Sequence, residues 1–158
     1  MNDHDHNAAE LSIERAENAR ELAACLNIRE QVFTGEKGVP RDIERDACDR
    51  LNGPCDHFAV RWGGESAGAL RCLRLDPAAV KLQRFCFLKE YRDLGLGRKV
   101  LQFIEGYYQS RGFTRIVMDA KFDVAGFYEK CGYTKTSDPF TEAGVVHVAM
   151  AKNLRGGR

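Results

Sequence analysis

Several features that mark common protein classes are missing from this chain of 158 residues. Its charges nearly cancel, with 24 lysine and arginine residues against 23 aspartate and glutamate residues, so no overall field attracts nucleic acid or an anionic membrane. No apolar run approaches the ~20 residues that a membrane-spanning helix needs. The N-terminus is polar and lacks the apolar core of a secretory signal. We therefore expect a cytoplasmic protein that binds neither nucleic acid nor membrane.

The six cysteines also lack the spacing of a metal or redox motif. None belongs to a Cys-x-x-Cys pair, which argues against zinc binding and thioredoxin-type chemistry. Their even number leaves a disulfide set open, but a cytosolic chain keeps its thiols reduced. We predict six free thiols and no metal site.

The length and the 44% hydrophobic content suit one compact domain with its own core. We expect residues 1–10 to form a polar, disordered tail and residues 11–154 to form this single domain. Neither an internal repeat nor a low-complexity linker divides the chain.

Hydrophobic periodicity predicts a domain of mixed α/β type. The expected strands cover residues 12–17, 57–62, 67–75, 79–88, 115–120 and 145–151. The expected helices cover residues 19–33, 100–108 and 123–130. Asp123 is expected to cap the last helix, and residues 41–50 form a short helix or an ordered loop. The strands in the middle of the chain are typical of an antiparallel meander.

The most informative segment is a turn with two glycines before the long helix. Gly95 and Gly97 lack side chains and let the backbone approach an anion. The first N–H groups of a helix have no internal partner, and the helix dipole makes that end slightly positive. Arg92, Arg98 and Lys99 add positive charge. The segment therefore has the outline of a pyrophosphate site.

Two other interpretations of this turn are weighed against the phosphate site. A bare Gly-x-Gly opens many helices for steric reasons alone. A Rossmann-type dinucleotide site is the second alternative, because Asp119 ends the next strand, where a ribose-binding acid belongs. Val100 at the third glycine position argues against that site, as does the long polar stretch before Gly95. The Walker spacing is absent as well.

Two motifs then resemble a known family. The pattern Arg92-x-x-Gly95-x-Gly97, after an apolar strand and before a helix, resembles the coenzyme A signature of the GNAT acetyltransferase superfamily. Residues 126–133, Gly-Phe-Tyr-Glu-Lys-Cys-Gly-Tyr, resemble the second signature of that family, Phe-Tyr-x-Lys-x-Gly-Phe. The two motifs agree with the family in order, spacing and secondary-structure setting. The likeness runs from about residue 58 to residue 152.

The N-terminal third resembles a subgroup of this superfamily, the small bacterial proteins of the ElaA type. The matching residues are Arg29, Val32, Phe33, Glu36, Gly38, Val39, Pro40, Glu44, Asp46 and Asp49. Residues 140–150 supply the C-terminal counterpart. A related pattern occurs in acyl-homoserine lactone synthases, which share the fold. Those enzymes are longer and usually have tryptophan where this chain has Val39.

The resemblance implies a single GNAT-type α/β domain whose mixed sheet has about six to seven strands, splayed between the fourth and fifth strands and flanked by helices. It implies acetyl-CoA as co-substrate, with the pantetheine arm inserted at the splay like an extra strand. Phe85, Cys86 and Phe87 would pair with this arm through their backbones, and the backbone N–H near Phe87 would polarise the thioester carbonyl. The residues that would hold the pyrophosphate are Arg92, Asp93, Leu94, Gly95, Leu96, Gly97 and Arg98.

The resemblance also assigns a general acid. Tyr128 matches the tyrosine that protonates the departing thiolate in many members, and a phenol with a pKa near ~10 suffices for that step. A tyrosine packed in the core is the alternative. The general base is open among Glu36, Glu44, Asp46, Asp49 and His147. Glu36 is the first choice, and a solvated charged surface is the alternative for each acid.

These observations predict an N-acetyltransferase that moves an acetyl group from acetyl-CoA to a primary amine by direct attack. The acceptor is a small molecule or a peptide, and the four carboxylates of Glu36, Glu44, Asp46 and Asp49 favour a cationic one. The protein is expected to be a monomer or a homodimer. Two alternatives remain: a non-catalytic regulatory module that binds acyl-CoA, and an acyl-homoserine lactone synthase. The second requires an S-adenosylmethionine site that the sequence does not reveal.

Overall fold

A computed structural model describes residues 10–154 of the chain. Within this range eight strands form one sheet in the order β1-β2-β3-β4-β5-β8-β6, and β7 pairs with β8. The strands are β1 Leu11–Arg15, β2 Cys55–Trp62, β3 Glu65–Arg74, β4 Ala79–Phe87, β5 Arg115–Lys121, β6 Thr134–Lys135, β7 Phe140–Glu142 and β8 Val145–Asn153. The predicted mixed α/β fold is therefore confirmed, with a slightly larger sheet than expected.

Helices of three kinds connect the strands. The α-helices are α1 Ala19–Arg29, α2 Arg41–Glu44, α3 Leu96–Gln109 and α4 Ala125–Lys130. A π-helix, η2, spans Glu30–Glu36, and two single 3-10 turns are η3 Lys89–Tyr91 and η4 Phe122–Val124. The helix predicted over residues 19–33 thus changes its winding after Arg29. The hydrogen bond from Lys37 N to Val32 O, which spans five residues, continues this wider winding.

Two further predictions need correction. Asp123 does not cap α4: it lies in η4, the N-cap position is Val124, and no side chain caps this helix end. The strands β6 and β7 were not expected, because two- and three-residue strands with mostly exposed side chains carry no periodic signal. Residues 1–9 of the predicted tail lie outside the described residues.

The chain divides into two compact units that interleave along the sequence. The first contains the described residues up to Cys72 together with Arg84–Val100, and the second contains Leu73–Gln83 together with the residues from Leu101 onward. Both β4 and α3 therefore begin in one unit and end in the other. The single domain over residues 11–154 stays a prediction.

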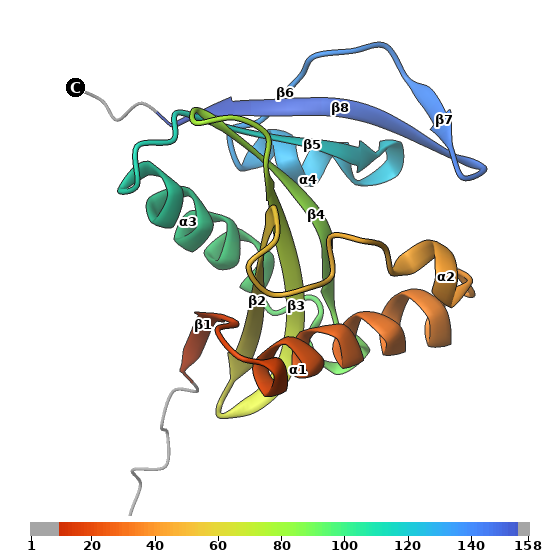
Figure 1. Ribbon diagram of the computed structural model, residues 1–158. Coiled ribbons are helices and arrows are strands. Elements are labelled where there is room, and N and C mark those ends of the chain that lie inside the picture. Colours follow the sequence, from red (N-terminus) through yellow and green to blue (C-terminus); the bar gives the residue numbers. More distant parts are fainter. Residues whose placement is uncertain (1–9, 155–158) are drawn as a thin grey trace, which may run out of the picture. The chain divides into compact units, whose positions relative to one another are not determined.

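The first unit has a core built by α1, η2 and the sheet. Leu22, Cys25 and Ile28 recur on one face of α1 with helical spacing and are buried. They cluster with residues of η2, β3 and β4: Val32, Ala69 and Cys86. Figure 1 shows α1 lying against β2. This packing fixes the end of η2 beside the segment that follows β4.

The second unit is built on the antiparallel strands β5 and β8. In their register Arg115 pairs with Asn153 at one end and Lys121 pairs with His147 at the other. The short β7 extends β8 as a hairpin (Figure 1). The start of β4 pairs with β5 in parallel, from Ala79–Arg115 to Lys81–Val117. Both strands continue past this pairing, as the predicted splay between the fourth and fifth strands requires.

Among residues 10–154, none of the helices combines the length and the apolar character that a transmembrane segment requires.

Candidate acyl-donor and acceptor site

The end of β4 presents two faces with different surroundings. Cys86 belongs to the buried core beside Cys25, and burial raises the pKa of its thiol to about 12. Phe85 and Phe87 lie on the opposite face, because side chains alternate along a strand. Both are half-buried, and their ring centroids are 5.5 Å apart. The predicted pantetheine-binding segment therefore has an inert thiol inside and a partly exposed aromatic face outside.

A tight turn follows η3 and leads into α3. Asp93 and Gly95 have positive φ angles of 62° and 77°, a region that glycine adopts without strain. The N–H groups of the first turn of α3, which starts at Leu96, have no intrahelical partner. A Cβ added to Gly95 would meet no atom within 4 Å. Open space thus lies beside a backbone with the geometry of an anion site.

Arg92 is held by two neighbours in this turn. Its Nε and Nη2 donate to the Phe87 carbonyl oxygen at 3.0 and 2.8 Å. Its Nη1 and Nη2 donate to the two carboxylate oxygens of Glu36 at 2.7 and 2.6 Å. Hydrogen bonding from Arg92 lowers the pKa of Glu36, and the same contact raises the pKa of Arg92. The structure thus joins the predicted base to a predicted phosphate ligand.

Other cations remain around the turn. Arg98 and Lys99 lie in the first turn of α3 and are exposed, and Lys89 of η3 is exposed as well. Leu96 is buried and anchors the start of the helix. The residues present therefore fit a pyrophosphate, since exposed cations flank the helix N-terminus while Arg92 engages Glu36.

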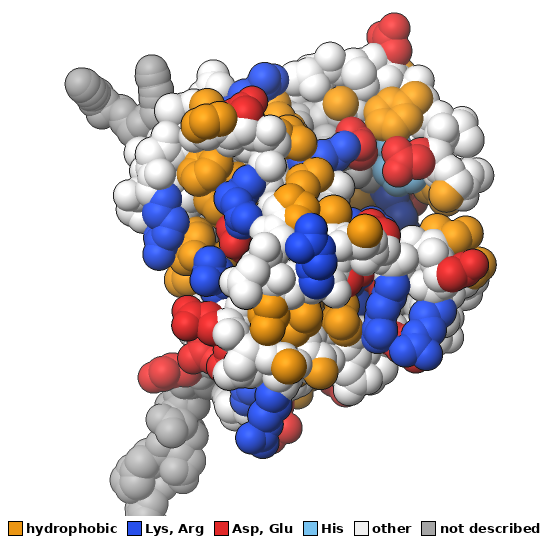
Figure 2. Space-filling view, viewed as in Figure 1, with side chains coloured by type: hydrophobic (Ala, Val, Ile, Leu, Met, Phe, Trp, Pro, Cys, Tyr) orange, Lys and Arg blue, Asp and Glu red, His pale blue; other side chains and the backbone are white. Residues whose placement is uncertain are grey.

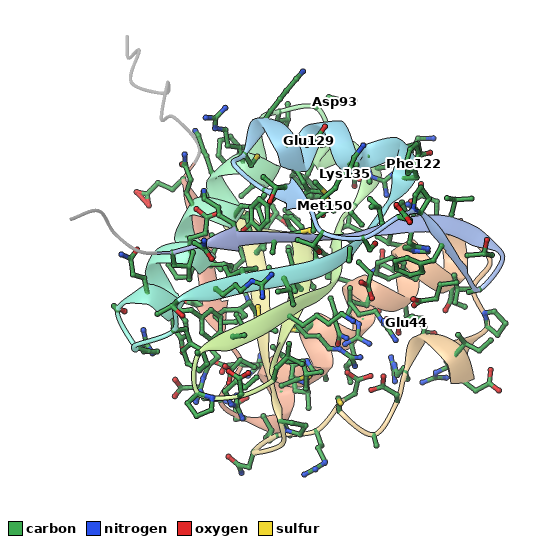
Figure 3. All side chains as sticks on the ribbon, turned by 90° about the horizontal axis from the view of Figure 1, so that it is seen from above. Glu44, Asp93, Phe122, Glu129, Lys135 and Met150 are labelled. Carbon is green, nitrogen blue, oxygen red and sulfur yellow. The ribbon has the colours of Figure 1, made fainter. Side chains whose placement is uncertain are left out.

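The first unit also contains a buried ion-pair network that no sequence pattern predicted. Arg29, at the end of α1, has a fully buried side chain. Its Nε donates to Glu44 Oε2 at 2.7 Å, and its Nη1 and Nη2 donate to the carboxylate of Asp49 at 2.8 and 3.0 Å. Figure 3 labels Glu44 on α2. The second carboxylate oxygen, Glu44 Oε1, is buried and has no hydrogen-bond partner among the described residues.

Two more arginines complete this network. Arg71 of β3 donates to Asp49 at 2.8 Å and to Asp46 at 2.7 and 2.8 Å. Arg84 of β4 has a positive φ of 56° and donates from Nε to the Glu44 carbonyl oxygen at 3.0 Å. Burial alone would raise the pKa of Asp49, but hydrogen bonds from Arg29 and Arg71 outweigh it, and the net pKa is lowered. Hydrogen bonding from Arg71 likewise lowers the pKa of Asp46.

This network changes what the general-base candidates can do. Glu44, Asp46 and Asp49 each pair with an arginine. Their negative charge is balanced by Arg29 and Arg71, which lie 15 to 25 positions away in the sequence. His147, in the second unit, stacks on Phe140 with ring centroids 6.0 Å apart.

Tyr128 lies on α4 in the second unit. Its side chain is half-buried and packs against Phe127 and Tyr133, with ring centroids 5.1 and 6.0 Å away. Burial raises the pKa of its phenol to about 12, so the hydroxyl keeps its proton at neutral pH. Within residues 10–154 no hydrogen bond engages this hydroxyl. Figure 3 labels Glu129 on the same helix, together with Phe122 of η4 and Lys135 of β6.

The cysteines and acids of the described residues offer no metal centre. No group of three or more His, Cys, Asp or Glu side chains in residues 10–154 is arranged to hold a metal ion. All six cysteines are free thiols.

Comparison with known proteins shows the family to which the chain belongs. The family model described as "Acetyltransferase (GNAT) domain" matches residues 30–154. The Bacillus subtilis protein YjcF, named as an uncharacterized N-acetyltransferase, is 32% identical over 139 residues, which are 87% of this chain and 96% of YjcF. The chain therefore belongs to the GNAT acetyltransferase family, as the two sequence motifs indicated.

Solved structures agree with this assignment. A Lactobacillus plantarum protein provisionally named as an N-acetyltransferase is 29% identical, with a TM-score of 0.84 over 92% of this chain and 99% of that chain. Escherichia coli ElaA is 21% identical, with a TM-score of 0.77 over 91% of this chain and 99% of its own. The likeness to ElaA shows a shared fold.

Proposed function

We propose that this protein is an acetyl-CoA-dependent N-acetyltransferase that acts on a primary amine by direct attack. The GNAT family uses acetyl-CoA, and the observation that carries the proposal for this chain is the turn at the start of α3. Its positive φ angles at Asp93 and Gly95, the open space beside Gly95 and the exposed Arg98 and Lys99 suit the pyrophosphate of coenzyme A.

Acetyl-CoA supplies an activated acetyl group as a thioester. The backbone of β4 near Phe87 polarises the thioester carbonyl, and the half-buried rings of Phe85 and Phe87 exclude water from it. The amine nitrogen forms the new bond to the carbonyl carbon while the carbon–sulfur bond breaks. Tyr128 gives its hydroxyl proton to the departing sulfur, and solvent returns a proton to the phenolate. The raised pKa of Tyr128 keeps this proton in place until the thiolate forms.

Glu36 is the proposed receiver of the proton that the amine loses. Its pKa is lowered by hydrogen bonding to Arg92, so the carboxylate is ionised at neutral pH. Both of its oxygens accept from Arg92, and proton transfer to Glu36 requires one of these contacts to open or a water to intervene.

The contacts give less support to a cationic acceptor than the sequence did. Of the four candidate acids, Glu36, Glu44, Asp46 and Asp49, Glu44 and Asp49 have buried side chains and Asp46 is partly exposed, and all three of these are ion-paired. Only Glu36 remains a partly exposed acid on η2 that borders the proposed donor turn. The preference for a cationic amine, the small-molecule or peptide nature of the acceptor and the monomer or homodimer state stay predictions.

An acceptor screen tests the proposed function. Purified protein is mixed with acetyl-CoA and one candidate from a panel of neutral amines, polyamines, amino acids and peptides, and the release of free coenzyme A is followed with a thiol reagent. The proposal predicts amine-dependent release and an acetylated product by mass spectrometry. Saturable acetyl-CoA binding without amine-dependent release from any acceptor would instead favour a regulatory module.

A further inference from the structure

A hydrogen-bonded chain of side chains in the second unit leads to the turn behind Tyr128. The hydroxyl of Tyr133 donates to Glu105 Oε2 on α3 at 2.9 Å. Lys152 Nζ, from β8, donates to Glu105 Oε1 at 2.9 Å and to the carbonyl oxygen of Cys131 at 2.9 Å. Two elements, α3 and β8, therefore hold the turn that follows α4: Glu105 accepts from Tyr133, and Lys152 donates to Cys131.

This turn, residues 131–133, ends the helix that carries Tyr128. Tyr133 N donates to the Tyr128 carbonyl oxygen at 3.0 Å, and Gly132 N donates to the Glu129 carbonyl oxygen at 3.0 Å. Gly132 has a positive φ of 98°. This pair of bonds around a left-handed glycine is a Schellman motif, in which Tyr133 occupies the position that packs against Tyr128. Their rings meet edge to face at 6.0 Å.

Burial makes this arrangement rigid. The Tyr133 side chain is among the most deeply buried in the structure. Burial and the neighbouring Glu105 carboxylate raise the pKa of the Tyr133 phenol, so it always donates to Glu105. Lys152 neutralises that carboxylate, which would otherwise be costly in a partly buried place. The Tyr133 ring can therefore neither rotate freely nor leave its place without breaking a charge-assisted hydrogen bond.

The hydroxyl of Tyr128 has no comparable anchor. It makes no hydrogen bond within residues 10–154, so its direction depends on how the ring packs against Phe127 and Tyr133. The Tyr133 ring, which Glu105 holds in place, is thus one of the two rings that pack against Tyr128.

We propose that Glu105 and Tyr133 are positioning residues for acetyl transfer: the Glu105–Tyr133 hydrogen bond holds the Tyr133 ring, and this ring aims the Tyr128 hydroxyl at the leaving sulfur. The inference rests on the proposed function, since it assigns a task to Tyr128. Both residues would act on the proton-transfer step through the Tyr128 ring, so acetyl-CoA binding should stay unchanged when either is altered.

The test is a double-mutant cycle between Tyr133→Phe and Tyr128→Phe, measured as kcat and acetyl-CoA KM with the best amine of the acceptor screen. Tyr133→Phe keeps the ring and removes its one hydrogen bond, so kcat should fall about five- to tenfold with an unchanged KM. In the Tyr128→Phe background the same change should alter kcat by less than about twofold, because there is no hydroxyl left to aim. Tyr107→Phe on α3, whose ring lies under Arg111, is the matched control.

A second measurement does not depend on an acceptor. In protein labelled with ¹³C at the tyrosine ring, Tyr133→Phe should shift and broaden the Tyr128 resonance, and the control Tyr107→Phe should leave it in place. Glu105→Gln keeps the shape and an acceptor oxygen but loses the charge. Glu105→Gln should lower kcat less than Tyr133→Phe does. It replaces Tyr133→Phe in the test if that variant does not fold.

The outcomes separate the two claims. An equal fall in kcat in both backgrounds, or an unmoved Tyr128 resonance with wild-type kcat, overturns the positioning of Tyr128 by Tyr133. Wild-type turnover in Tyr128→Phe alone overturns the acid assignment itself, and with it any need to aim that hydroxyl.

Discussion

Some arginine–carboxylate pairs of this chain are buried and others are partly exposed, and this difference in exposure determines how much each pair contributes to stability. Arg29 and Glu44 have side chains that are 0% and 2% exposed, so removing either leaves an uncompensated buried charge. Arg92 and Glu36 are 31% and 37% exposed, and solvent screens much of their attraction. The first pair therefore holds α1 to α2, whereas the second opens at lower cost, as the proposed proton transfer to Glu36 requires.

Glu36→Gln tests the proposed base. Glutamine keeps one oxygen that accepts from Arg92, so the turn at the start of α3 should stay in place and acetyl-CoA affinity should change little. The charge that would take up the amine proton is lost, and we expect a lower kcat and a higher acceptor KM in steady-state kinetics. If acetyl-CoA affinity falls while the acceptor parameters stay at wild-type values, Glu36 serves only to hold Arg92.

Tyr128→Phe tests the proposed acid. The change removes one half-buried hydroxyl that makes no hydrogen bond within residues 10–154, so stability and acetyl-CoA affinity should be nearly unchanged. Turnover should fall roughly 10²-fold or more, the usual effect of losing a general acid. Thermal unfolding and calorimetry on the same variant provide the control, and equal turnover in variant and wild type would reassign Tyr128 to packing.

At the scale of elements, irregular helix ends place the site residues. The π-helix η2 carries Glu36 to Arg92, and a π-helical segment in this position fits the frequent use of such windings at functional sites. The buried network ties α1, α2, β3 and β4 together through Arg29, Glu44, Arg71 and Arg84. This network holds β4, the strand that precedes the turn at the start of α3.

Asp49→Asn should destabilise the protein strongly through this network. Asp49 accepts from both Arg29 and Arg71, and its side chain is 4% exposed. Removing its charge leaves two buried arginines short of a partner, which costs about 3–5 kcal/mol in comparable cases. The measurement is the free energy of unfolding from urea titration. Glu30→Gln, at the exposed pairs with Arg41 and Arg45, is the control and should change stability by less than about 1 kcal/mol.

The lowered pKa of Asp49 predicts how the free energy of unfolding depends on pH. The pKa of Asp49 is lower in the folded state than its unfolded value of ~3.9, so its contribution is fully present above pH ~4 and is lost as the pH falls toward the folded pKa. The unfolding free energy of wild type should therefore drop steeply below pH ~4. Asp49→Asn should show a shallower drop, and parallel curves for the two proteins would contradict this assignment.

The elements also show how far the sequence could lead. The long amphipathic helix was predictable because buried Val100, Leu101, Ile104 and Tyr108 recur with helical spacing. The glycine turn was predictable because its chemistry is local. The ion-pair network was not, because its partners lie 15 to 40 positions apart and arginine is ordinarily a surface residue. Glu105 escaped notice for the same reason, since its contacts with Tyr133 and Lys152 span 28 and 47 positions.

Across the whole molecule the surface charge is mixed. Figure 2 shows basic and acidic side chains interspersed over the visible face, in line with the formal net charge of +1. Binding of a polyanionic nucleotide would thus depend on the local cations Lys89, Arg98 and Lys99 rather than on an overall field. Added salt should weaken it moderately, because these side chains are exposed and therefore screened.

Calorimetric titration of the protein with acetyl-CoA tests the central claim most directly. The account predicts saturable binding and a matching rise in melting temperature, equivalent to ~2.7 kcal/mol when the ligand exceeds its Kd about 100-fold. Gly97→Val should abolish both effects, because a branched side chain at the start of α3 blocks the approach to its backbone. Gly106→Val, on an exposed face of the same helix where an added Cβ meets open space, should bind like wild type. Absence of heat and of any thermal shift in wild type at millimolar acetyl-CoA would contradict the account.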